Sequence, residues 1–316
     1  MHRIDVQALR QGQRRALAKA ITLVESHNPE HRPAADALLA EIMPWTGQAF
    51  RLGISGVPGV GKSTFIESFG LRAIEQGQKI AVLAVYPSSP VNGGSILGDK
   101  TRMEQLSRTE GAYIRPSPAG DSLGGVAQRT REAILLCEAA GYDQIWIETV
   151  GVGQSEHEVA NMTDAFMVLM QPGAGDELQG IKKGILELAD LIVVNKADGE
   201  AKQLAEFSRR HYQNALNLLT HNGFWSPEVL SVSALKTDGL EALEGLLQQY
   251  RLAGAKEIPA KRTRQNLSWF ERLVKDQLWQ QAIHGTLRED WLRQREAVLQ
   301  GQVSPVTAAQ AVFKPT

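Results

Sequence analysis

The spacing of apolar residues changes twice along the chain and divides it into three zones. In the first zone, residues 1–47, apolar residues recur near the helical period over residues 6–24 and again over residues 34–43. His27-Asn28-Pro29 interrupts the pattern between them. This zone is therefore predicted to be an N-terminal helical extension.

The second zone, residues 48–253, alternates short apolar, β-branched runs with helix-like stretches. Strands that crossover helices bury on both faces have this composition. Six such runs are present, at residues 50–55, 79–85, 144–148, 165–170, 191–195 and 229–232. The alternation predicts a three-layer α/β domain around a mainly parallel sheet.

The third zone, residues 254–316, has the helical period again. Its apolar stripe carries Phe270 and three tryptophans, Trp269, Trp279 and Trp291. A stripe at this spacing is more typical of a packing surface than of a ligand box. A short helical arm cannot bury these rings alone, so we expect it to form a homodimer interface.

The charge balance and the cysteine content limit which binding partners and which cellular compartment are expected. Among 316 residues, 34 Lys and Arg balance 35 Asp and Glu, which argues against a dedicated nucleic-acid binder. The single cysteine, Cys137, lies in an apolar helical pattern and is interpreted as a buried small hydrophobe. No signal peptide is evident and no apolar run is long enough to span a membrane. We therefore expect a cytoplasmic protein with neither a nucleic-acid nor a membrane partner.

The strongest chemical signal is Gly56-Val57-Pro58-Gly59-Val60-Gly61-Lys62-Ser63, a full match to the phosphate-loop pattern G-x-x-x-x-G-K-[ST]. An apolar run precedes it and a helix-like stretch follows. The glycines let backbone N–H groups turn toward phosphate oxygens, and the helix start adds the positive end of its dipole. We expect Lys62 to reach the β- and γ-phosphates and the Ser63 hydroxyl to bind Mg²⁺. The predicted nucleotide contacts here are Gly56, Val57, Pro58, Gly59, Val60, Gly61, Lys62, Ser63 and Thr64.

A second motif, Asn195-Lys196-Ala197-Asp198, follows the run at residues 191–195 and predicts the base. Guanine presents two donors on one edge, N1–H and the 2-amino group, and a carboxylate accepts both. Asp198 therefore selects guanine over adenine, while the Lys196 stem lies over the base and Asn195 completes the motif. Ser233-Ala234-Leu235 follows the next run, where a backbone N–H is expected to meet guanine O6. The expected ligands are GTP and GDP with Mg²⁺.

Glu148-Thr149-Val150-Gly151 ends the run at residues 144–148. A carboxylate at that strand tip can hold the Mg²⁺ water shell, and the Gly151 N–H can approach the γ-phosphate. Loops of this kind reorder on hydrolysis. The alternative is a solvated glutamate at a strand exit.

With these elements placed, the sequence resembles the MeaB/ArgK family of G proteins, whose mitochondrial relative is the methylmalonic aciduria type A protein. Besides the P-loop, the resemblance lies in residues 21–25, 87–103, 148–156 and 175–184. The stretches around Ser95 and Gln179 are long and idiosyncratic, so they separate this family from other GTPases better than the P-loop does.

The resemblance implies a homodimeric GTPase with helical extensions at both ends of the G domain. Such proteins are chaperones of adenosylcobalamin-dependent mutases, chiefly methylmalonyl-CoA mutase; they gate cofactor loading and protect the mutase. It also implies that residues 90–103 and 148–156 are switches I and II. Residues 171–184 would be a third switch that couples the nucleotide site to the mutase, although a simple strand-to-helix connection is the alternative.

The resemblance assigns two further roles and exposes one departure. Asp99 and Gln154 are the candidates, with Lys62, for catalysis, and Asp99 joins Ser63 and Glu148 as a candidate metal ligand. The alternative for Asp99 is a solvated loop residue. Family members have an aspartate just before Pro-Ser-Ser-Pro, where this chain has Tyr86. A phenol is a poor Mg²⁺ ligand, which puts metal handling or the hydrolysis rate in doubt.

Two other functions remain open at this point. One is a nucleotide-dependent kinase or ATPase linked to basic amino-acid (arginine/ornithine) transport, which the guanine-selecting Asp198 disfavours. The other is a GTP-dependent assembly factor for a different metalloenzyme.

Overall fold

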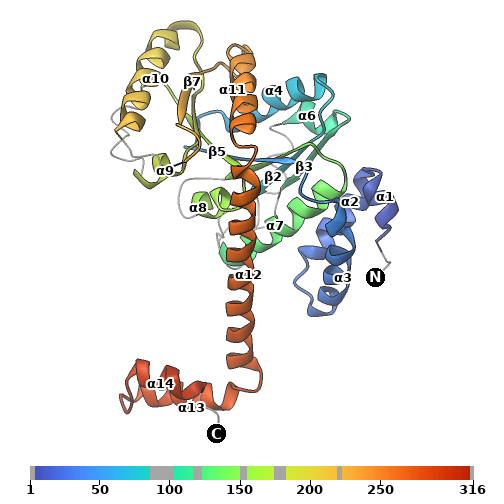
Figure 1. Cartoon of the computed structure of the whole chain (residues 1–316), viewed down its shortest axis with the longest axis vertical. Helices are drawn as coiled ribbons and strands as arrows, with labels where there is room; N and C mark the ends of the chain where they lie inside the picture. The colour runs from blue at the N-terminus through green and yellow to red at the C-terminus, as the bar shows by residue number, and fades with distance from the viewer. Residues whose placement is uncertain are drawn as a thin grey trace. The chain divides into compact units, whose positions relative to one another are not determined.

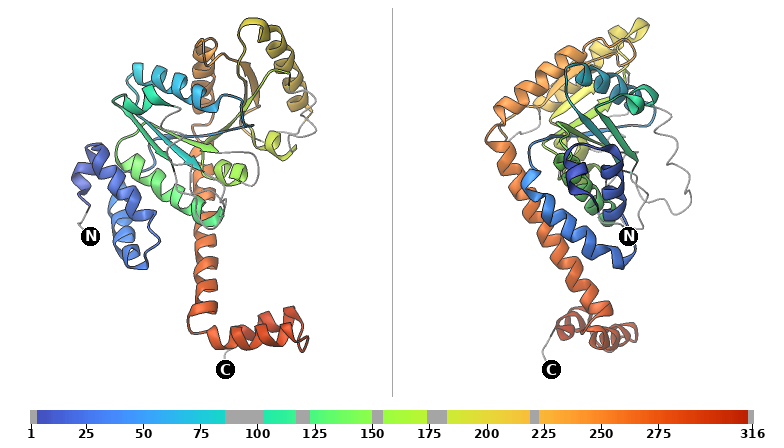
Figure 2. Two further views of the ribbon diagram at one scale, coloured as in Figure 1. Left: turned by 180° about the vertical axis from the view of Figure 1, so that it is seen from behind. Right: turned by 90° about the vertical axis from the view of Figure 1, so that its right-hand side faces the viewer.

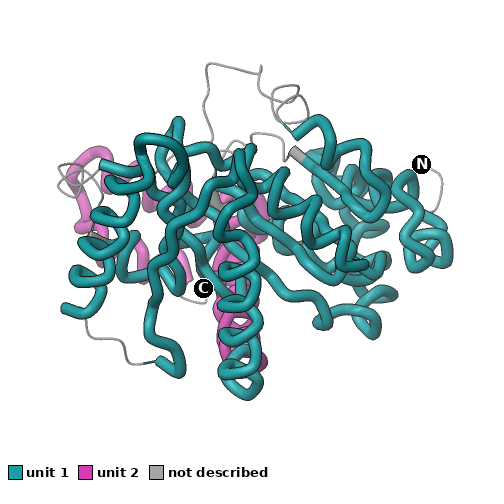
Figure 3. The backbone as a smooth tube through the Cα atoms, turned by 90° about the horizontal axis from the view of Figure 1, so that it is seen from above, with its two compact units in different colours: residues 1–258 teal, residues 259–316 magenta. Residues whose placement is uncertain are grey.

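The computed structural model describes residues 4–85, 103–116, 123–149, 155–173, 183–218 and 223–313. The chain divides into two compact units, residues 1–258 and 259–316, coloured separately in Figure 3. The zone boundaries near residues 47 and 253 stay predictions.

The first unit is built around a seven-stranded sheet with strand order β3-β2-β4-β1-β5-β6-β7 (Figure 1). Every pairing among these strands is parallel. The strands are β1 Phe50–Gly56, β2 Ile80–Val85, β3 Ala112–Pro116, β4 Gln144–Thr149, β5 Ala165–Met170, β6 Leu191–Val194 and β7 Glu228–Ser231. The predicted α/β fold with a mainly parallel sheet is confirmed.

Helices cover both faces of this sheet and complete the three layers (Figure 2). One face packs against α4 Lys62–Glu75, α6 Glu104–Arg108 and α11 Leu240–Ala253. The other packs against α7 Leu123–Ala139, α8 Ser155–Ala160, α9 Lys183–Leu188 and α10 Lys202–Asn217, with the turn η4 Gly199–Ala201 leading into α10. Strands β1, β2 and β5 are buried along their whole length, which explains their unbroken apolar sequences.

The strand β3 corrects the prediction of six strands. It lies at the edge of the sheet, and among the described strands its one partner is β2. Its five residues include Arg115 and end on Pro116, so the sequence lacks the apolar run that marks a strand buried on both faces. Pairing with β2, a tertiary contact, creates this strand.

The N-terminal helices are α1 Val6–Arg10, α2 Arg14–Val24 and α3 Arg32–Ile42, with the turns η1 Pro29–His31 and η2 Met43–Trp45. The pattern over residues 6–24 predicted one helix, but the chain breaks at Gly12, which adopts a left-handed conformation (φ +74°) that a helix interior excludes. Helices α2 and α3 pack on α7. Arg32 Nη1 lies 2.8 Å from Glu132 Oε1 of α7, and Arg115 pairs with the buried Glu25, which caps the C-terminus of α2.

Cys137 lies on α7 with no exposed surface, as predicted. Burial raises the pKa of its thiol, because the thiolate would lose its hydration in this apolar interior. The cysteine therefore acts as a packing residue.

The second unit is helical. It contains most of α12 Glu257–His284, with α13 Arg288–Leu299 and α14 Pro305–Val312. Trp279 and Trp291 meet edge to face with ring centroids 6.1 Å apart. Within the described part of the chain, no helix combines the length and apolar character that a membrane crossing requires.

Candidate functional site

The phosphate loop follows β1 at the carboxyl edge of the sheet, between the neighbours β4 and β5. Ligands of parallel α/β sheets bind at this edge, where the connections on either side of a strand diverge. Gly61 caps the N-terminus of α4 in a left-handed conformation (φ +90°), and a Cβ there would lie 2.9 Å from Asn195 Nδ2. Only glycine therefore allows both the turn and the close approach of Asn195.

Lys62 and Ser63 begin helix α4, where the backbone N–H groups of the first turn and the helix dipole favour an anion. The Lys62 ammonium donates a hydrogen bond to the Gly56 carbonyl oxygen at 2.6 Å, so the side chain folds back over the loop that it follows. Gly56, Lys62 and Ser63 thus gather at one turn, with Thr64 exposed beside them. The arrangement suits the β- and γ-phosphates of a nucleotide.

Asn195 ties the base loop to the phosphate loop. Its side-chain amide donates to the Val60 carbonyl oxygen at 2.9 Å, and its side-chain oxygen accepts the Ala234 backbone N–H at 3.1 Å. Asn195 is 2 % exposed. One buried carboxamide therefore holds the phosphate loop, the Asn195–Asp198 loop and the Ser233–Leu235 loop in a fixed relation.

Lys196 and Asp198 occupy the base loop on either side of Ala197. Lys196 has φ +62°, and its ammonium donates to the Gly59 carbonyl oxygen at 2.6 Å, so its stem spans from the base loop to the phosphate loop. Asp198 accepts a hydrogen bond from the Ser233 hydroxyl. That hydroxyl in turn accepts the Lys236 N–H at 3.1 Å, which fixes the rotamer of Ser233 and the direction of the Asp198 carboxylate.

The Ser233–Leu235 loop adds backbone groups to this side of the site. Ser233 and Ala234 are buried, whereas Leu235 is 73 % exposed. The structure therefore brings Asn195, Lys196, Asp198 and the Ser233–Leu235 loop together from two separate strand ends. A carboxylate held beside backbone N–H groups suits the edge of guanine.

The donors at the strand tips fit Mg²⁺. Glu148 is the residue before the last of β4, its Cα pairs in register with Ile54 of β1, and it is 4 % exposed. A carboxylate and the Ser63 hydroxyl are hard oxygen ligands, and Mg²⁺ takes few protein ligands because phosphates and waters complete its shell. Within the described ranges no group of three or more His, Cys, Asp or Glu forms an all-protein metal cage.

Four residues that sequence interpretation assigned to the site lie outside the described residues, namely Tyr86, Asp99, Gly151 and Gln154. Their proposed roles stay predictions.

The structure also shows two hydrogen bonds that the sequence motifs did not predict. The Lys236 N–H orients Ser233, and the Thr149 hydroxyl donates to Ser55 between β4 and β1. The Thr149–Ser55 bond depends on the pairing of two distant strands, whereas the Lys236–Ser233 bond closes a local turn after β7. Asn195 lay within the motif, but its link to Val60 was not foreseen.

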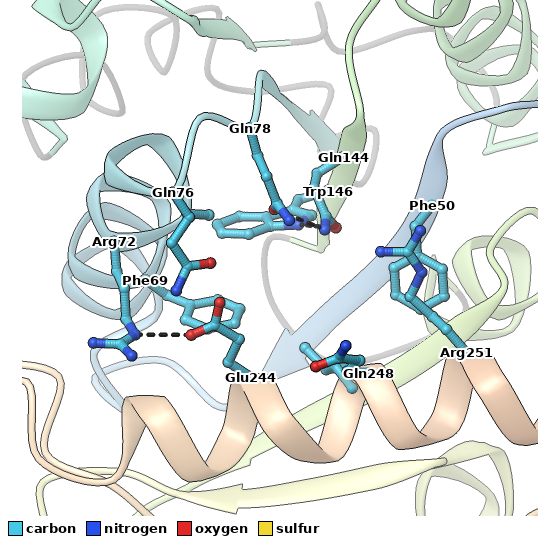
Figure 4. A pocket seen from close by; sticks show the side chains of 12 residues that line it. Phe50, Phe69, Arg72, Gln76, Gln78, Gln144, Trp146, Glu244, Gln248 and Arg251 are labelled. Carbon is cyan, nitrogen blue, oxygen red and sulfur yellow. Dashed lines mark hydrogen bonds and ion pairs between the residues drawn. The ribbon is translucent and has the colours of Figure 1, made fainter.

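A pocket of about 270 Å³ lies at the opposite, amino edge of the sheet and is separate from this site (Figure 4). Phe69 and Trp146 stack in its wall with centroids 5.2 Å apart. An ion pair between Arg72 and Glu244, 3.0 Å from Nε to Oε2, closes one side and joins α4 to α11. This pocket is not where the nucleotide loops converge.

Joined phosphate and base loops at the carboxyl edge of a parallel sheet define a P-loop nucleoside triphosphatase, here of the guanine-nucleotide class. More particularly, the chain belongs to the MeaB family: residues 17–286 match the family described as methylmalonyl Co-A mutase-associated GTPase MeaB. The chain is therefore a GTP hydrolase.

Two relatives and one solved structure show the same affiliation. The chain is 49 % identical to the Escherichia coli GTPase ArgK over 87 % of this chain and 84 % of that protein. It is 45 % identical to the mouse mitochondrial methylmalonic aciduria type A homolog over 96 % of this chain and 76 % of that protein. The crystal structure of a LAO/AO transport system kinase is similar with a TM-score of 0.76 and 38 % identity, covering 97 % of this chain and 94 % of that one.

Proposed function

We propose that this GTPase requires Mg²⁺ and acts as a nucleotide-switched chaperone of an adenosylcobalamin-dependent mutase, chiefly methylmalonyl-CoA mutase. The observation that carries the proposal is the family match over residues 17–286, whose description names a mutase-associated GTPase. The name of the mouse relative, a methylmalonic aciduria type A homolog, agrees with it. The chaperone would gate cofactor loading and protect the mutase.

At the nucleotide site, Lys62 and the N–H groups of the P-loop would bind the phosphates. Asp198, held by Ser233, would accept the two donors of guanine, with the Lys196 stem beside the base. Ser63 and Glu148 would hold Mg²⁺, which neutralises phosphate charge when bound. Asp99 and Gln154 complete the proposal as residues that position water or metal, and Gly151 as the contact to the γ-phosphate.

The anchors of residues 171–184 support a coupling role for this segment. Where the segment leaves β5, the Gly173 N–H donates to Ser208 Oγ of α10 at 3.0 Å, and Leu204 packs against Gly173. Helix α10 follows the base loop directly, and α9 at the far end of the segment packs on α8. Both ends thus rest on elements that continue from nucleotide loops. A change in those loops would then reach the segment that we propose contacts the partner.

The partner is tested by calorimetry and pull-down with the organism's own methylmalonyl-CoA mutase, in GDP and in a non-hydrolysable GTP analogue. We expect binding whose affinity depends on the nucleotide, and by linkage the mutase must change nucleotide affinity by the same factor. Lys182→Ala/Lys183→Ala should reduce this coupling while leaving GTP binding unchanged. The control Arg15→Ala/Lys19→Ala removes the same charge from exposed positions of α2 and should leave coupling intact. Absence of binding in both nucleotide states would refute the chaperone role but not the GTPase.

We further propose that the second unit forms the homodimer interface. Leu267, Phe270 and Leu278 are 57 %, 60 % and 47 % exposed along α12. Helices α12, α13 and α14 also enclose an apolar pocket of about 340 Å³ walled by Trp279 and Trp291. Exposed apolar surface of this extent is typical of a protein interface.

The alternative that keeps one observation in its favour is a kinase linked to basic amino-acid transport, because the similar crystal structure carries such a title. The Asp198 carboxylate disfavours it, since adenine lacks the paired donors of guanine. Incubation with labelled GTP or ATP and candidate acceptor proteins tests this function through label transfer. Action in the cytoplasm stays a prediction.

A further inference from the structure

Ser55 and Thr149 form a hydroxyl pair inside the sheet. Thr149 Oγ1 donates a hydrogen bond to Ser55 Oγ at 2.9 Å, and neither residue has exposed surface. The two belong to neighbouring strands, β1 and β4, and the parallel register that pairs Ile54 with Glu148 places them one step further along. The bond therefore connects two strands through side chains, beyond the last backbone pair in that register.

The two hydroxyl residues are direct neighbours of residues that we assign to the nucleotide site. Gly56, the first residue of the phosphate loop and the acceptor of the Lys62 ammonium, follows Ser55 directly. Glu148, the proposed Mg²⁺ ligand, precedes Thr149 directly. The hydroxyl pair thus lies one residue from the phosphate loop on β1 and one residue from the proposed Mg²⁺ ligand on β4.

We propose that Ser55 and Thr149 are positioning residues for GTP hydrolysis: their hydrogen bond sets the distance between the phosphate loop and the strand tip that carries Glu148. Past the Ile54–Glu148 pair, Ser55 stays in register with β5 and Thr149 with β2, so the backbone pairing between β1 and β4 ends at this point. A buried hydroxyl without its partner is costly, and so the pair resists separation of the two strand ends. The inference depends on the GTPase activity, and the mutase partner has no part in it.

The expected effect falls on turnover more than on binding. Nucleotide affinity rests on the P-loop N–H groups at the end of β1 and on the Asn195–Asp198 loop after β6, a strand on the other side of β1 from β4. Hydrolysis also requires the groups on β4 at a set distance from the γ-phosphate, and small displacements lower the rate of such reactions strongly. If the pair were merely structural, its loss would lower the stability of the fold and leave kcat unchanged.

Thr149→Val tests this because valine keeps the branched shape and removes the donor. We expect kcat for GTP to fall on the order of tenfold, with KM and GDP affinity within about threefold of the natural chain. Thr149→Ser keeps the donor and should restore kcat to within about threefold. Ser55→Ala removes the acceptor from the other side, and adding it to Thr149→Val should cost little more, because the two act as one unit.

The matched control is Thr130→Val. Thr130 is also buried, at 1 % exposure, but its hydroxyl donates to the Val126 carbonyl oxygen at 2.9 Å within α7. It should lower the urea midpoint about as much as Thr149→Val does while leaving kcat unchanged. Equal kcat for the two valine variants would overturn the proposal, as would a failure of Thr149→Ser to restore turnover in a folded protein.

Discussion

Asn195 and Val60 lie 135 positions apart in the sequence, yet the Asn195 side-chain amide donates to the Val60 carbonyl oxygen at 2.9 Å. The bond crosses from the loop after β6 to the middle of the phosphate loop. Because the same side chain also accepts the Ala234 N–H, three loops from different strands share one buried group. Order in the phosphate loop is therefore linked to order in the base loops.

Replacing this group should weaken nucleotide binding as a whole. Asn195→Ala leaves the Val60 carbonyl oxygen and the Ala234 N–H without their buried partner, which costs about 1–3 kcal/mol per group. We expect the affinities for GTP and GDP to fall together by at least about tenfold, measured by calorimetry. Asn161→Ala, at an exposed position, is the control and should bind normally. Full affinity in the Asn195 variant would show that the link is dispensable.

Base selection depends on the Asp198 carboxylate. Asp198→Asn places a donor opposite guanine N1–H, so GTP should bind less tightly by about 10- to 100-fold, the range of a lost charged hydrogen bond. The variant should gain xanthosine triphosphate, whose 2-oxo group accepts a donor. Competition with a fluorescent nucleotide measures both. A natural chain that prefers ATP to GTP in the same assay would contradict the assignment.

Tyr86 occupies the position at which the family resemblance implies an aspartate. If that carboxylate serves Mg²⁺ or water, Tyr86→Asp should raise single-turnover GTP hydrolysis with little change in GTP affinity. Tyr86→Phe is the control, since it removes the hydroxyl without adding a carboxylate. Equal single-turnover rates in Tyr86→Asp and the natural chain would mean that the position has no catalytic part.

The apolar stripe of α12 should decide the oligomeric state. Phe270→Lys/Leu278→Lys places two charges on surface that we propose a second chain covers, and burying them unpaired is unfavourable. Light scattering should then report a monomer that still binds GTP. Val274 also belongs to this exposed apolar stripe. Asp276 lies two positions further on and therefore on the opposite side of the helix, so the Asp276→Lys variant should remain dimeric. A dimeric double variant would place the interface elsewhere.

Much of the architecture was predictable from the sequence because the burial of a strand or helix determines the spacing of its apolar residues. Strands such as β1 and β5 are covered on both faces, so each is a continuous apolar run. The edge strand β3 was not predictable, because an edge strand with one neighbour needs no such run and Arg115 and Pro116 obscure it. Gly12 similarly divided a periodic segment into two helices, since a single left-handed residue is invisible to apolar spacing.

The sequence by itself determined the chemistry of the site: a phosphate loop needs glycines and a lysine at set spacings, and guanine needs a carboxylate after Asn-Lys-x. These requirements are local, so they can be read along the chain. Only the tertiary structure decided which groups hold the loops in relation to one another. Asn195 reaches Val60, and Thr149 reaches Ser55, only because parallel pairing brings β6, β1 and β4 to one edge of the sheet. Contacts between segments that lie far apart in the chain produce no recognisable spacing pattern in the sequence, because they depend on both the strand order and the direction of each side chain.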